Sequence, residues 1–157
     1  MTGMYTATAV LAALAKRDQT GEGDYIDVAM LDVECAILSN QAMNFLLSGK
    51  TPRRHGNAHP NVAPYSVFRT ADGHMIIGCG NQGQWEKLCG AIGRSDLPAD
   101  PRFADMPKRN SHRLALTQEL EKTLTTEPSA VWIGKLTAAG VPNGPINDYR
   151  QVFEHPQ

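Results

Sequence analysis

The residues best suited to contact a small polar ligand lie in a loop near the middle of the chain, Gly56–Tyr65. Its prolines fix φ and remove backbone donors, and its asparagines can bond to their own main chain. This composition excludes a helix and predicts a stiff, polar loop. The candidate ligand-contacting residues are Asn57, His59, Asn61 and Tyr65. We expect them to form the rim of an active site, because the loop separates two unlike halves of the sequence.

A second candidate is the segment Gly78–Gly83, whose glycines match the spacing of the dinucleotide-binding pattern G-x-G-x-x-G. The strand before it belongs to a predicted hairpin, and no acidic residue ends a parallel strand about twenty residues on, so a dinucleotide fold is disfavoured. Two interpretations stay open. Asn81 and Gln82 could line a pocket at a helix N-terminus that binds an anionic group. Alternatively, the segment is a tight turn in which one of them caps the helix.

Other patterns that carry chemistry are missing from the sequence. There is no Cys-x-x-Cys or His-Glu-x-x-His pair, so no metal site is expected. No serine lies in a Gly-x-Ser-x-Gly elbow, which removes the main signature of nucleophilic hydrolysis. Asp27 and Asp32 bracket a predicted strand-to-helix turn, where carboxylates commonly cap amides. The residues alone therefore assign no catalytic group.

The first half of the chain predicts an incomplete α/β domain. Residues 7–17 form an alanine-rich helix that is apolar almost all round, which is typical of a buried helix. Residues 25–29 alternate as a strand, and residues 30–47 predict a second helix. A helix, a strand and a helix do not close a sheet, because the strand needs neighbours. We therefore interpret residues 1–50 as the C-terminal portion of a larger α/β domain.

The second half predicts a small α+β domain over residues 65–157, joined to the first by a linker and active-site loop at 51–64. Strands at 65–69 and 74–78 flank an Asp-Gly turn, which is a strong hairpin signal. A stiff loop is expected at 141–146. The expected helices cover about 84–92, 110 or 111 to 124, 126–128 to 139, and 148–154.

Composition bounds the class of protein. The chain has 157 residues, of which 41% are hydrophobic, and a formal charge of −1, so neither nucleic acid nor an anionic membrane is indicated as a partner. The longest apolar run, residues 7–15, is too short to span a bilayer. Cys35, Cys79 and Cys89 have no paired spacing and are expected to be buried thiols. Together with the lack of a signal-peptide pattern, they favour a cytoplasmic location.

Five segments, taken in order, resemble those of class III CoA-transferases of the CaiB/BaiF type, which include formyl-CoA transferase and the related α-methylacyl-CoA racemases. Because these segments cover nearly the whole chain, the resemblance is far more specific than any one motif. The segments are Thr2–Tyr5 with the helix after it, Arg17–Asp32, the loop Gly56–Tyr65 with the turn Thr70–Gly73, Asp100–Phe103, and Ala139–Ile146.

The resemblance implies a Rossmann-like large domain, a small α/β domain, and a homodimer of two interlocked ring-like subunits. It implies CoA transfer from an acyl-CoA to a carboxylic acid, with the CoA thioester as substrate and no permanently bound cofactor. In the family an aspartate attacks the thioester and carries CoA as an aspartyl-CoA intermediate. That aspartate lies a few residues before the segment matched by Thr2–Tyr5. We therefore expect a fragment that is inactive by itself.

The loop departs from the family pattern at the residues expected to move. In the formyl-CoA type a glycine-rich loop opens and shuts over the intermediates, whereas here the equivalent residues are the stiffer His59–Pro64. Large lid motion and oxalate specificity are therefore not expected. A racemase-like enzyme and a non-catalytic dimerisation module both stay open as alternatives.

Overall fold

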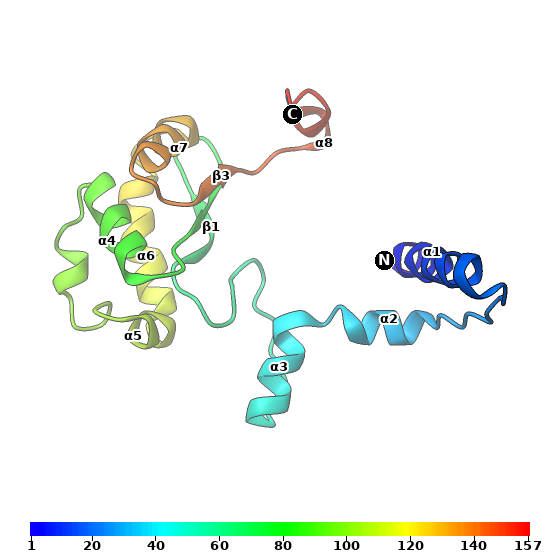
Figure 1. The fold of residues 1–157 in the computed structure, drawn as a ribbon. Helices are drawn as coiled ribbons and strands as arrows, with labels where there is room; N and C mark the ends of the chain where they lie inside the picture. The colour runs from blue at the N-terminus through cyan, green and yellow to red at the C-terminus, as the bar shows by residue number, and fades with distance from the viewer. The chain divides into compact units, whose positions relative to one another are not determined.

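The computed structural model describes residues 1–157 and divides into two compact units, Met1–Arg54 and His55–Gln157 (Figure 1). The first unit contains three helices, α1 (Thr2–Thr20), α2 (Met30–Ala36) and α3 (Ser39–Ser48). Gly21 and Gly49 end α1 and α3 in the left-handed conformation, with φ of 75° and 68°. Glycine adopts these angles without steric cost, so both helix ends follow directly from the sequence.

Two expectations for the first unit are wrong. Residues 25–29 form no strand, because no other strand of this chain lies beside them and an isolated strand leaves its ladder groups unpaired. The helix expected over residues 30–47 is interrupted at Ile37 and Leu38, and Ser39 has a φ of 51°. No proline or glycine marks this break, so the sequence pattern gave no sign of it.

The expected burial of the first helix is also not seen. No residue of α1 is buried by this chain, and Leu11 remains 68% exposed. Cys35 of α2 is exposed as well, which corrects its expected burial, whereas Cys79 and Cys89 in the second unit are buried as expected. The common reason is that the first unit makes few contacts of its own and has only one fully buried hydrophobic residue, Val33.

The second unit is built on a three-stranded antiparallel sheet in the order β1 (Tyr65–Arg69), β2 (His74–Gly78), β3 (Asn143–Pro145). The predicted hairpin is confirmed, with Tyr65 opposite Gly78 and Arg69 opposite His74. The third strand was expected to be a loop. Gly144 and Pro145 argue against a strand, but such residues are tolerated in a short strand at the sheet edge.

Helices of the second unit largely follow the predicted pattern. They are α4 (Gln82–Ala91), α5 (Met106–Ser111), α6 (Arg113–Leu124), α7 (Ser129–Ala138) and α8 (Tyr149–Phe153), with a 3₁₀ turn η1 (Leu97–Ala99). The helix start expected at residue 110 or 111 is wrong. The chain instead forms α5, capped by the side chain of Asp105, which accepts from Lys108 N. Pro107 lies in the first turn, where it is compatible with a helix.

The core of this unit lies between the sheet and helices α4, α6 and α7, which gather on one side of the sheet (Figure 1). Phe68, Met75 and Ile77 point into it from the strands. The buried residues at helical spacing are Trp85 and Leu88 of α4, Ile92 at its C-terminal end, and Leu116, Leu120 and Leu124 of α6. No helix is long and apolar enough to cross a membrane.

Candidate functional site

The loop Gly56–Tyr65 closes on itself through His59 and Tyr65. The amide of His59 donates to the carbonyl oxygen of Tyr65 at 2.9 Å. The two rings are stacked, with 5.3 Å between centroids and an interplanar angle of 12°. One backbone bond and one ring contact therefore join two residues that the sequence proposed for the rim.

Asn61 also belongs to this arrangement. Its backbone N–H donates to His59 Nδ1 at 3.2 Å, so in this geometry Nδ1 is an acceptor and the ring proton of the neutral form lies on Nε2. The side-chain amide of Asn110 donates to the carbonyl oxygen of Asn61. The first part of the loop is thereby tied both to itself and to α5.

Arg109 of α5 holds the end of the loop from the protein interior. Its side chain is fully buried (0% exposed), and Nε donates to the carbonyl oxygen of Ala63 at 2.9 Å. Nη1 donates to Gln82 Oε1 at 3.0 Å and to the carbonyl oxygen of Phe103 at 2.9 Å. The guanidinium carbon lies 5.1 Å from the centre of the Trp85 ring. Arg109 therefore links the loop to the N-terminus of α4.

The charge of Arg109 is not balanced by an ion pair. None of the ion pairs in the structure includes it, and its Nη2 is buried without a hydrogen-bond partner. Burial lowers the pKa of this guanidinium, because desolvation disfavours the charged form. Arg109 could not be identified from the sequence, since nothing local distinguishes it from the exposed Lys108 and Arg102.

Asn81 and Gln82, the two candidates before α4, take different roles. Asn81 caps the helix, its Oδ1 accepting from Gln84 N at 2.9 Å, which is the capping interpretation left open by the sequence. Gln82 accepts from Arg109, and its Nε2 donates to Glu86 Oε1 at 3.2 Å. Both side chains thus organise the corner between β2 and α4.

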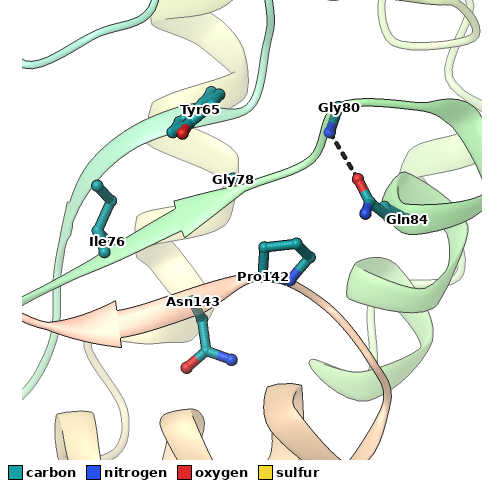
Figure 2. A pocket seen from close by; sticks show the side chains of 7 residues that line it. All are labelled: Tyr65, Ile76, Gly78, Gly80, Gln84, Pro142 and Asn143. Atoms are coloured by element: carbon teal, nitrogen blue, oxygen red, sulfur yellow. Dashed lines mark hydrogen bonds between the residues drawn. The ribbon is translucent and has the colours of Figure 1, made fainter. Parts of the chain in front are cut away.

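A cavity of about 380 Å³ lies beside this corner (Figure 2). Figure 2 shows the side chain of Gln84 reaching back from α4 to the amide of Gly80, which donates to Gln84 Oε1 at 2.7 Å. The cavity is lined by Tyr65, Ile76, Gly78, Gly80, Gln84, Pro142 and Asn143. Neither Gln84 nor Asn143 was among the residues predicted for the site. Asn143 reaches the cavity only through the third strand, which the sequence did not predict.

Gly78 makes room for the Tyr65 ring. A Cβ atom on Gly78 would lie 3.2 Å from Tyr65 Cε2, closer than an ordinary carbon contact. The two residues face each other across the β1–β2 ladder. The glycine therefore leaves room for the tyrosine ring, which also stacks on His59.

Only one of the six predicted site residues lines this cavity, namely Tyr65. His59 does not line the cavity but stacks on Tyr65, and Asn61 in turn bonds to His59. Asn57 lies elsewhere, lining a wider depression of about 930 Å³ together with Asp72, His74 and Ser129. Asn57 is thus not brought together with the others in that cavity.

The chemistry available in the cavity is binding and orientation. Its lining has a phenol, two side-chain amides and backbone groups, but no carboxylate, amine, imidazole or thiol. No group of three or more His, Cys, Asp or Glu side chains is placed to hold a metal ion. The lining can therefore contact a ligand's polar groups without supplying a nucleophile.

A comparison with known protein families adds the decisive observation. The family described as CoA-transferase family III matches residues 1–157. The chain belongs to this family. Its CaiB/BaiF resemblance is thereby confirmed.

The proteins of known name to which this chain is similar include CoA-transferases. The chain is 43% identical over 161 residues to the succinate–glutarate CoA-transferase of Agrobacterium fabrum, covering 99% of this chain and 39% of that protein. It is 39% identical over 155 residues to the acetyl-CoA:oxalate CoA-transferase of Acetobacter aceti, covering 99% of this chain and 40% of that protein. The chain thus spans about two fifths of the length of these relatives.

Solved structures agree. A CAIB/BAIF family protein from Brucella suis matches with a TM-score of 0.79 at 45% identity, over 99% of this chain and 41% of that one. Rv3272 from Mycobacterium tuberculosis matches with a TM-score of 0.84 at 36% identity, over 98% of this chain and 40% of that one. The mixed α/β arrangement is therefore that of the family.

Proposed function

We propose that this chain is part of an acyl-CoA:carboxylate CoA-transferase that acts on a short dicarboxylic acid. The observation that carries the proposal is the 43% identity, over essentially the whole chain, to a succinate–glutarate CoA-transferase. Which acid a transferase accepts is set by the residues that surround the bound acid. The loop Gly56–Tyr65 and its neighbours lie in the region that matches this relative.

In this proposal the chain supplies one wall of the CoA-ester site and no nucleophile. The cavity beside Tyr65 has hydrogen-bonding groups but no side chain able to attack a thioester at neutral pH. An aspartate outside this chain would form the aspartyl-CoA intermediate, while Tyr65, His59, Asn61 and Gln82 shape the opposite wall. CoA enters as the thioester substrate, and no permanently bound cofactor is proposed.

The assembly proposed with this function is the one implied by the family. Residues 1–50 would complete a Rossmann-like large domain, residues 51–64 would connect it to the small domain of 65–157, and two subunits would interlock. The exposed apolar side chains of the first unit, such as Leu11 and Leu31, support a role in a larger body. A cytoplasmic location follows from the same proposal, since CoA thioesters are intracellular metabolites.

A chimera tests the proposal. The matched region of the Agrobacterium fabrum enzyme is replaced by residues 1–157, and transfer from succinyl-CoA to glutarate is followed by chromatography of glutaryl-CoA. We expect transfer by the chimera and none by the isolated chain. Tyr65→Ala in the chimera should reduce transfer at least tenfold, whereas Tyr149→Ala, which removes an 86% exposed tyrosine, should have little effect. A folded chimera without transfer would contradict the proposal.

A racemase-like activity is the alternative, and a second chimera, in which residues 1–157 replace the matched region of an α-methylacyl-CoA racemase, distinguishes it. A racemase inverts the α-carbon of one acyl-CoA and needs no acceptor acid. The racemase alternative would be favoured if one epimer of 2-methylacyl-CoA is converted into a mixture of both epimers in the absence of glutarate, and if no glutaryl-CoA is formed when glutarate is added. A third reading, a dimerisation module without catalysis, predicts neither product.

A further inference from the structure

A second cavity is lined by residues of the loop, strand β1 and helix α6. Its volume is about 230 Å³, and Ala63, Pro64 and Ser66 are among its lining residues. Tyr65 contributes to both linings. All of its lining residues belong to the second unit.

The cavity carries basic and no acidic side chains. Arg113 and His55 line it, no aspartate or glutamate does, and the hydroxyls of Ser66 and Thr117 add two neutral hydrogen-bonding groups. The remaining wall is apolar, with Phe68 and Leu116 from the edge of the core. An occupant matching this lining is an anion with a short carbon body.

Arg113 has the hydrogen-bonding capacity to bind such an anion. Its Nη2 donates to Asn110 Oδ1 at 2.6 Å and, more weakly, to the carbonyl oxygen of Pro60 at 3.4 Å. Both acceptors are neutral, and Nε and Nη1 donate to no protein atom. A guanidinium has five N–H donors in a planar fork that fits a carboxylate with two parallel bonds. Both two-bond edges of the fork include Nη2, which is already engaged, so Nε and Nη1 would each donate a single hydrogen bond to an anion.

The charge of Arg113 is uncompensated within the protein. It takes part in none of the ion pairs, unlike Arg94, whose Nη2 lies 2.8 Å from Asp96 and 3.1 Å from Glu119. Burial lowers the pKa of Arg113, and no nearby carboxylate opposes that shift. A partly buried cation without an acid is costly, and an external anion would offset the cost. The first turn of α6, which starts at Arg113, also has no acidic side chain.

We propose that this cavity is a binding site for a small organic carboxylate, held by the charge of Arg113 and by a hydrogen bond from its Nε or Nη1. His55, Ser66 and Thr117 would contact the same carboxylate or the far end of a dicarboxylate, and Phe68 and Leu116 would contact its methylene groups. Inorganic phosphate lacks the carbon body that the apolar wall accommodates. The site goes beyond the proposed transfer reaction, because it binds an acid with or without CoA. It depends on that proposal only for the choice of glutarate as the probe.

Equilibrium dialysis of the full chain against radiolabelled glutarate, without CoA, tests the site and tolerates any self-association. We expect saturable binding of one glutarate per chain, weakened at least tenfold by Arg113→Gln. Arg113→Lys should fall in between, since it keeps the charge but loses the fixed directions of the guanidinium donors. Lys122→Gln on the same helix is the matched control, because Lys122 lies outside the cavity and pairs with Glu119. It should bind as the unchanged chain does.

Three results would overturn the site: no saturable binding by the folded chain, equal binding by Arg113→Gln, or displacement of glutarate by inorganic phosphate as effectively as by unlabelled glutarate. Circular dichroism establishes that each variant is folded. If Arg113→Gln does not fold, Thr117→Val replaces it, with an expected loss of about threefold in affinity for one hydrogen bond. Because the assay contains no CoA, its failure is separate from failure of the chimera to transfer CoA.

Discussion

The imidazole of His59 stacks on the phenol ring of Tyr65, and the amide of His59 donates to the carbonyl oxygen of the same tyrosine. The pair closes a turn of the loop, and Tyr65 also lies beside Gly78 and lines the cavity. A change at Gly78 should therefore act on His59 through the tyrosine ring.

Gly78→Ala should destabilise the second unit by about 0.5–1 kcal/mol, the value of an aromatic pair. The new Cβ would lie 3.2 Å from Tyr65 Cε2, so the half-exposed ring would have to shift, which would disturb its stacking on His59. Urea unfolding followed by tryptophan fluorescence gives the change. In a His59→Ala background the loss should shrink, because the stack is already gone. Gly144→Ala is the control, since its Cβ would make an ordinary 3.6 Å contact with Ile76. Equal losses in both backgrounds would contradict this account.

Arg109→Met should reduce the free energy of unfolding by on the order of 3 kcal/mol or more. The substitution leaves the buried carbonyl oxygens of Ala63 and Phe103 and the amide of Gln82 without their donor. Arg102→Ala is the matched control, because Arg102 is half exposed and its solvent-screened pair with Asp100 should contribute little to stability. Urea unfolding measures both. A loss at Arg109 no larger than at Arg102 would show that the buried guanidinium does not hold the loop.

Protonation of Asp72 in acid should make the second unit less stable. Ser129 N donates to its Oδ1 at 2.8 Å and Thr70 Oγ1 at 2.9 Å, and these bonds hold the pKa of Asp72 below its usual range. The stabilisation is complete above the ordinary aspartate pKa of about 4 and is lost as the pH falls through the lower folded value. Asp72→Asn should keep a hydrogen-bond acceptor at the start of α7 but remove this part of the acid dependence. Urea midpoints between pH 2 and 6 provide the measurement, and identical pH profiles would refute the assignment.

One of the three cysteines should react quickly with a disulfide reagent at pH 8. Burial raises the pKa of the Cys79 and Cys89 thiols to about 12, so almost no thiolate is present, whereas Cys35 is exposed. We expect one fast equivalent per folded chain, none in Cys35→Ser, and three after unfolding. Above the ordinary thiol pKa the unfolded chain loses these protons first, so stability should decline as the pH rises toward 12. Two fast-reacting thiols per folded chain would contradict the burial of either Cys79 or Cys89.

The isolated chain should self-associate at micromolar concentration through its first unit. Leu31 and Leu46 are both 72% exposed and Leu47 is 82% exposed, while the hydrophobic core cluster lies entirely between Ala63 and Val141. Multi-angle light scattering should show species above the monomer mass for residues 1–157 and a monomer for residues 55–157. A monomeric full chain would count against a first unit that requires a partner.

Much of the second unit could be predicted because its signals are local. The Asp72–Gly73 turn and the alternation around it place both strands of the hairpin, and leucines at helical spacing place α6. The third strand, Asn143–Pro145, could not be predicted, since a short edge strand with Gly and Pro forms only where a partner is already present. The expected strand at residues 25–29 fails for the converse reason, because this chain gives it no partner.

By itself the sequence determined the family and the polar, stiff character of the loop Gly56–Tyr65, because residue types and their order are enough for both. Only the tertiary structure decided how the loop is held. It brings Arg109 under Ala63 from 46 residues away and Asn143 to the cavity edge through the third strand. It also leaves Arg113 beside a small cavity without an acid. Such contacts depend on which side chains the packed core forces together, and no local spacing encodes that.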